Sequence, residues 1–86
     1  MKMIVAILHD DDVENVIQAL MSENFRVTRV ASTGGFFRKG NTTLLAGVDD
    51  ERVDEAIGIM RKRATAAASE KHGTVFVVPV NRFEQL

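Results

Sequence analysis

The residues best suited to chemistry lie in one stretch, Thr28 to Gly47, which reads TRVASTGGFFRKGNTTLLAG. Residues 32–43 include two adjacent glycines, four hydroxyl side chains, one amide, two cations and two neighbouring phenylalanines. Adjacent glycines let the backbone adopt positive φ and approach another molecule closely. Backbone that can hold an anion, beside rings that can stack on a base, indicates a nucleotide rather than a sugar or peptide. The alternative is a hairpin loop whose phenylalanines pack under the sheet, since loops rich in Gly, Thr and Asn are common.

A second set of side chains suited to an anion lies on the strand expected at Phe25–Ala31, which leads into that stretch. Side chains alternate along a strand, so two opposite faces are predicted. One face carries Arg26, Thr28 and Val30, and the other carries Phe25, Val27 and Arg29. A guanidinium fork beside a hydroxyl is a suitable set of donors for a phosphate. The alternative is that Arg26 and Thr28 lie on a solvated or intersubunit face of the sheet.

Other chemistries have weaker support. His9 and residues 10–12 could suggest a metal site, but consecutive residues at a strand end point in different directions, and helix capping accounts for the aspartates. The chain has no cysteine, two histidines and no evident Ser/His/Asp set. The phosphate loop of small ferredoxin-like phosphatases is absent, and the paired phenylalanines fall in a loop rather than on a sheet as in RNA-recognition domains. We therefore expect no enzymatic activity, no metal and no cofactor.

Hydrophobic periodicity predicts six elements in the order β-α-β-β-α-β. The expected strands are Met3–Leu8, Phe25–Ala31, Thr42–Val48 and Thr74–Val80; the expected helices are Asp12–Ser22 and one with the apolar stripe Val53, Ala56, Ile57 and Met60. This order predicts an α+β, ferredoxin-like fold, with a four-stranded antiparallel sheet and two helices on one face. Residues 1–86 are expected to form a single domain.

Local signals predict where these elements begin and end. Asp10 or Asp11 is expected to cap the first helix, and Asp11 with Glu14 has the spacing of a capping box. Asn24 is expected in a left-handed turn before the second strand. The alanine-rich residues 64–68 are expected to prolong the second helix.

Composition indicates a small protein that associates with copies of itself. Eleven basic and twelve acidic residues give a formal net charge of −1, so no global field favours nucleic acid or an anionic membrane. No signal peptide or membrane span is evident, and the lack of cysteine is compatible with a reducing compartment. A chain of 86 residues is marginal as a monomer, and the last expected strand and much of the second are too apolar for a sheet face in open water. We therefore expect a soluble, cytoplasmic protein that forms a low-number ring.

Several segments closely resemble the cyclic-di-AMP receptor family, the small PII-like signalling proteins of bacteria. The segments are NFRVT at 24–28, TGGF at 33–36, GNTT at 40–43 and TVFVVPV at 74–80, and residues 1–7 and 47–55 are similar too. The resemblance covers nearly the whole chain in the right order. It implies a PII-like homotrimer that binds cyclic di-AMP in clefts between adjacent subunits, without catalysis. It also implies that a downstream protein reads a changed loop conformation.

The same resemblance implies roles for individual residues. Those that would contact phosphate and ribose are Asn24, Arg26 and Thr28; those that would hold an adenine or its edge are Gly35, Phe36 and Asn41; Gly47 would offer backbone, and Gln85 would close the site. The full set of candidate ligand-binding residues is Asn24, Arg26, Thr28, Thr33, Gly34, Gly35, Phe36, Phe37, Asn41, Gly47 and Gln85.

The sequence departs from the family pattern in one large respect. Family members usually carry a long loop, thought to respond to ligand, between the second helix and the last strand. Here that connection shrinks to about Ala66–Gly73, which removes an expected lid and output surface. Phe37 also replaces an aliphatic residue, and Leu86 an aromatic one. The alternatives are a PII-like regulator that binds another adenine nucleotide or small anion, such as ATP or AMP, and a structural trimer whose loop only contacts a partner protein.

Overall fold

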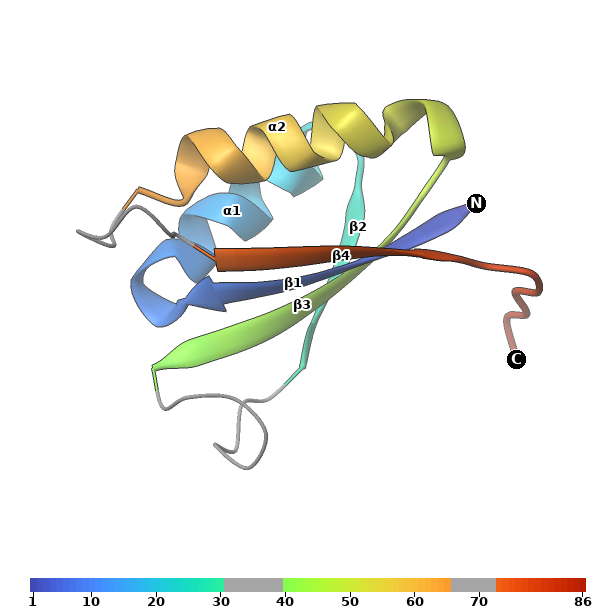
Figure 1. Ribbon diagram of the computed structural model, residues 1–86, viewed down its shortest axis with the longest axis horizontal. Coiled ribbons are helices and arrows are strands. Elements are labelled where there is room, and N and C mark those ends of the chain that lie inside the picture. Colours follow the sequence, from blue (N-terminus) through green and yellow to red (C-terminus); the bar gives the residue numbers. More distant parts are fainter. Residues whose placement is uncertain (31–39, 66–72) are drawn as a thin grey trace.

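The computed structural model describes residues 1–30, 40–65 and 73–86, and it shows one sheet with two helices over one face (Figure 1). In chain order the elements are β1 (Lys2–His9), α1 (Asp10–Ser22), β2 (Arg26–Val30), β3 (Asn41–Val48), a 3-10 turn (Asp50–Arg52), α2 (Val53–Arg63) and β4 (Gly73–Pro79). The strands lie in the order β2-β3-β1-β4, and each neighbouring pair is antiparallel. The predicted ferredoxin-like fold is therefore confirmed.

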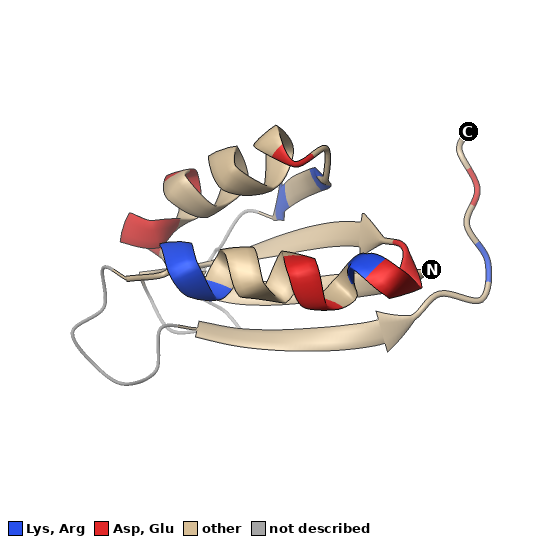
Figure 2. Cartoon of the chain, turned by 90° about the horizontal axis from the view of Figure 1, so that it is seen from above, with Lys and Arg blue, Asp and Glu red and all other residues tan. Residues whose placement is uncertain are grey.

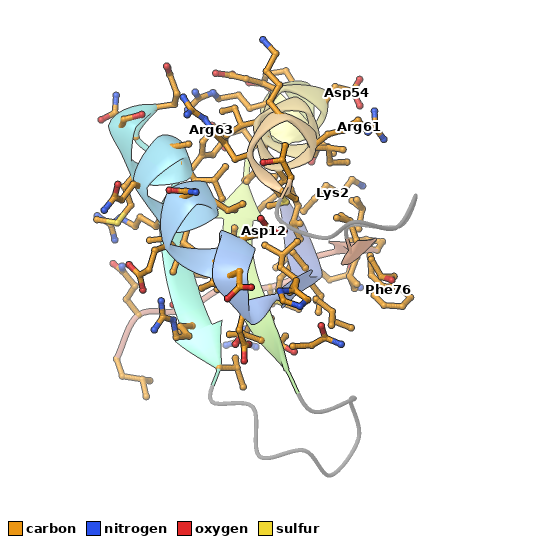
Figure 3. All side chains as sticks on the ribbon, turned by 90° about the vertical axis from the view of Figure 1, so that its left-hand side faces the viewer. Lys2, Asp12, Asp54, Arg61, Arg63 and Phe76 are labelled. Atoms are coloured by element: carbon orange, nitrogen blue, oxygen red, sulfur yellow. The ribbon has the colours of Figure 1, made fainter. Side chains whose placement is uncertain are left out.

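Strand β1 lies in the middle of the sheet because its residues are apolar on both faces. Ile4, Ala6 and Leu8 point toward the helices and are at most 2% exposed. They pack with α1 residues such as Val16 and Leu20 in the core between sheet and helices. Figure 3 shows this layering from the end of the molecule, with both helices on one side of the strands. The continuous apolar run at the start of the sequence thus became the central strand, as predicted.

Helix α1 begins two residues earlier than expected, and its N-terminal cap is a histidine. The Nδ1 atom of His9 accepts a hydrogen bond from the N–H of Asp11, at 3.3 Å. The prediction that Asp10 or Asp11 caps the helix is therefore wrong, because the aspartates lie inside the first turn. There their negative charges still interact favourably with the positive end of the helix dipole. Asp10 also accepts a hydrogen bond from Thr42 Oγ1 at 2.6 Å, which ties the start of α1 to β3.

Helix α2 ends at Arg63, before the alanine-rich residues. Ala64 has φ −87° and ψ 72°, which is not helical, and its side chain is buried in the core. The predicted extension of the helix is wrong at Ala64, because core packing outweighed helix propensity; residues 66–68 lie outside the described residues. The acidic and basic side chains of α2 occupy opposite ends, as the dipole favours (Figure 2).

The face of the sheet opposite the helices carries several apolar side chains that are partly exposed in the described part of the chain. The strand registers place on it a set of residues that we call the free sheet face: Met3, Val5, Ile7, Val30, Leu45, Phe76 and Val78. Phe76 is 53% exposed and Val78 39% exposed, although both are large and hydrophobic. Figure 3 shows Phe76 at the sheet, away from the helical layer. An apolar patch of this kind is typical of an interface rather than of a surface in contact with water.

None of the helices in the described part of the chain is long and apolar enough to cross a membrane.

Candidate functional site

The turn between α1 and β2 fixes the backbone around Asn24. The N–H of Asn24 donates to the carbonyl of Met21 at 3.0 Å, and the N–H of Phe25 donates to the carbonyl of Leu20 at 3.0 Å. This pair of bonds is the Schellman motif, which ends many helices with a left-handed residue. Asn24 has a φ of 68°, so the predicted left-handed turn is confirmed. The exposed side chain of Asn24 thereby lies just ahead of β2.

A shallow depression of about 200 Å³ lies where β2 begins and β3 ends. Its lining comes from the α1–β2 turn, the two strand ends, the first residue of the chain and the 3-10 turn. The lining residues are Asn24, Phe25 and Arg26, then Gly47, Val48 and Asp49, and finally Met1 and Arg52. Arg26 and Gly47 lie opposite each other in the β2–β3 ladder. The fold therefore brings together three of the predicted ligand-binding residues, Asn24, Arg26 and Gly47.

The two arginines of β2 have different surroundings. Arg29 points to the helical side and pairs with Glu14 of α1. Arg26 is exposed on the opposite face, and within the described ranges it has no ion pair. Thr28 follows on the same face as Arg26 and is also exposed. Among the described residues no carboxylate pairs with this guanidinium, and a guanidinium and a hydroxyl on one face are donors that suit a phosphate group.

Arg52 lines the depression but had not been predicted as a site residue. Its Nε and Nη2 atoms donate to the carboxylate of Glu55, each at 2.9 Å, and Nη2 also donates to the carbonyl of Glu23 at 3.0 Å. The hydrogen bonds from Arg52 hold the pKa of Glu55 below its ordinary value. The guanidinium also lies over the ring of Phe25, with Cζ 4.0 Å from the ring centroid. In the sequence, the only visible sign of these contacts is the three-residue spacing between Arg52 and Glu55.

Thr28, Asn41 and Gln85 are described but do not line this depression within one chain. Asn41 pairs with His9 at the opposite end of β3, roughly 20 Å from Gly47 at the ~3.3 Å rise per strand residue. Gln85 lies in the exposed segment after β4, which is the strand at the other edge of the sheet from β2. The candidates Thr33, Gly34, Gly35, Phe36 and Phe37 lie outside the described residues.

Substitution of Asn24 separates its backbone role from any role of its side chain. Asn24→Ala is expected to lower the free energy of unfolding by about 1 kcal/mol, because alanine is strained at positive φ. Asn24→Gly is expected to leave stability near wild type, because glycine adopts this conformation readily. Urea unfolding followed by circular dichroism, at matched protein concentration, measures both changes. Equal stability of the two variants would contradict the assigned role of the left-handed turn.

Comparison with known proteins places this chain among close relatives. A family model described as "Cyclic-di-AMP receptor" matches residues 1–71. The chain is 29% identical over 93 residues to the nitrogen fixation nifHD region GlnB-like protein 1 of Methanothermococcus thermolithotrophicus, with 93% of this chain and 88% of that protein covered. A crystal structure of a functionally unknown protein from Pediococcus pentosaceus superimposes with a TM-score of 0.83 and 32% identity. That match covers 99% of this chain and 96% of the other.

Proposed function

Since this chain belongs to the cyclic-di-AMP receptor family and is a PII-like signalling protein, we propose that it binds cyclic di-AMP in clefts between the subunits of a homotrimer. The observation that best supports this proposal is the depression in which Asn24, Arg26 and Gly47 meet. It lies at the end of a sheet whose free face carries apolar side chains that are partly exposed in the described part of the chain.

Two side chains of the depression, Asn24 and Arg26, and the neighbouring Thr28 on the same strand offer donors for a phosphodiester anion. Arg26 offers a guanidinium whose charge is not neutralised by an ion pair within the described ranges, and Thr28 offers a hydroxyl on the same face. Charge-assisted hydrogen bonds of this kind are stronger than those between neutral groups. The exposed amide of Asn24 adds both donors and an acceptor for the sugar or phosphate.

Gly47 supports a close approach of ligand to backbone. It is exposed within β3, and a Cβ atom added there would meet only Met1 Sδ, at the ordinary distance of 3.9 Å. Packing among the described residues of one chain therefore gives no reason for glycine at this position. A glycine within a strand often marks a site where another molecule approaches the backbone.

A second copy of the chain is needed to complete the proposed site. Asn41 is held away from the depression of its own chain, at the far end of β3, and Gln85 is not among the residues that line it. Association through the free sheet face would bury its apolar side chains and bring residues of neighbouring copies to one cleft. Within that cleft, Phe36 and Gly35 are proposed to hold an adenine, with Thr33, Gly34 and Phe37 beside them. The proposed output is conformational and non-catalytic, and a downstream protein reads it.

Isothermal titration calorimetry of the purified protein with cyclic di-AMP, ATP and AMP tests the proposal. We expect saturable heat with cyclic di-AMP and a stoichiometry of one ligand for each intersubunit cleft, with native mass spectrometry giving a trimer. Binding of ATP or AMP without any heat from cyclic di-AMP would support the alternative adenine-nucleotide regulator instead. A monomer in solution would contradict the intersubunit cleft.

A further inference from the structure

The contacts of Arg52 link three separate parts of the molecule at the depression. The residue lies at the end of the 3-10 turn, where α2 begins. Its guanidinium reaches the carbonyl of Glu23 at the end of α1, the carboxylate of Glu55 in α2 and the ring of Phe25 in the turn before β2. We propose that Arg52 is a positioning residue that holds the α1–β2 turn in the conformation needed for Asn24 and Arg26 to contact the ligand. This inference rests on the proposed function.

The position of Phe25 explains how Arg52 acts on residues that it does not touch. Phe25 is 5% exposed and stands between Asn24 and Arg26 in the sequence. One face of its ring lies against the guanidinium, and its N–H closes the Schellman motif. A shift of this ring therefore moves the backbone of both neighbours. The hydrogen bond from Arg52 to Glu23 fixes the same turn from its other end.

The charge of Arg52 is already paired, which separates its role from that of Arg26. Two of its N–H groups meet the two carboxylate oxygens of Glu55, side by side. Arg52 and Glu55 have side chains that are 33% and 44% exposed, so this pair alone adds little stability. Its effect is to hold the guanidinium of Arg52 over Phe25, while Arg26 has no ion pair among the described residues.

Lysine cannot take over this role, although it keeps the charge. An arginine side chain presents a planar fork of five donors, of which three are used here, and it stacks flat on an aromatic ring. The lysine ammonium is a point charge that cannot satisfy Glu55 and Glu23 while it also covers the Phe25 ring. Arg52→Lys therefore distinguishes positioning from direct attraction of an anionic ligand.

Hydrogen exchange of the ligand-free protein tests the positioning itself. In Arg52→Lys, protection of the Asn24 and Phe25 amides is expected to fall by about tenfold, because stacking and a charged hydrogen bond are lost. Glu55→Gln, which keeps the arginine, should give a smaller loss at the same amides. Arg29→Lys is the matched control, since Arg29 lies on the opposite face of β2 and outside the depression. Unchanged protection of both amides in Arg52→Lys would overturn the proposal.

Calorimetry with cyclic di-AMP tests the consequence for binding. We expect the dissociation constant of Arg52→Lys to rise about tenfold, while Arg29→Lys binds as wild type. Wild-type affinity in Arg52→Lys, with weaker binding in Arg52→Gln, would overturn positioning and assign Arg52 a direct charge contact. If the wild-type protein binds no cyclic di-AMP, the proposed function fails, and the exchange experiment alone decides whether Arg52 holds the turn.

Discussion

If the proposed trimer forms through the free sheet face, Phe76→Lys is expected to convert it to monomers without unfolding the chain. Phe76 lies on the free sheet face of β4 and is already 53% exposed in the single chain, so a lysine there can reach water in a monomer. In a trimer that buries this face, each copy would instead bury an unpaired ammonium, at a cost of several kcal/mol. The dissociation constant for assembly should therefore rise by at least about a hundredfold. Sedimentation velocity measures the assembly, and far-UV circular dichroism confirms that the chain stays folded.

The matched control for this experiment is Met21→Lys. Met21 is 59% exposed on α1, so it undergoes the same apolar-to-lysine change at similar exposure but on the helical side. We expect Met21→Lys to assemble as wild type. A trimer that survives Phe76→Lys would show that the free sheet face is not its interface.

Periodicity along β2 was the part of the site that the sequence predicted best. The alternation that separates Arg26 and Thr28 from Val27 and Arg29 is confirmed by the register with β3, by the packing of Val27 against the core and by the Arg29–Glu14 pair. This prediction succeeded because side chains alternate between the two faces of a strand. Once one apolar side chain identifies the buried face, the face of every other residue follows. The left-handed turn at Asn24 was equally accessible, because few residue types tolerate that conformation.

The helix ends were harder to predict because several residues competed for each role. The run His9 to Asp12 offers adjacent candidates for one cap, and residue preferences favour aspartate. The helix begins instead where the β1–β3 ladder ends, and this places His9 at the cap. At the other helix, Ala64 has a high helix propensity but is drawn into the core. In both cases, contacts between distant elements decided the boundary.

The depression itself could not have been read from the sequence. Arg52 contacts Glu23 and Phe25, which lie 29 and 27 positions earlier in the chain. Only the fold brings the end of α1 to the start of α2. The three-residue spacing of Arg52 and Glu55 is compatible with their ion pair, but it carries no information about the surface to which the pair belongs. Asn41 and Asn24 lie near opposite ends of the sheet of one chain, and the family resemblance, not their spacing in the sequence, assigned both to one cleft between subunits.

Arg26→Ala is expected to weaken binding of cyclic di-AMP by about ten- to a hundredfold, the effect of losing a charged hydrogen bond or two. The loss arises because Arg26 is the cation of the depression with no ion pair within the described ranges. Removing it breaks no ion pair described within the chain, so stability and assembly should not change. Calorimetry at several salt concentrations measures the effect, and the variant should also show a weaker dependence of affinity on salt than wild type.

Arg29→Ala provides a matched control on the same strand. It removes the same charge from the opposite face of the strand, outside the depression. The substitution breaks an exposed ion pair with Glu14. Such pairs contribute about 0–1 kcal/mol, so stability should change little, and binding should remain at the wild-type level. Asn41→Ala should weaken binding as Arg26→Ala does, with the trimer intact, because the proposed cleft draws Asn41 from a neighbouring copy. If Arg26→Ala and Arg29→Ala had equal effects on affinity, nonspecific charge would explain them, and Arg26 would be a solvated residue of the sheet face.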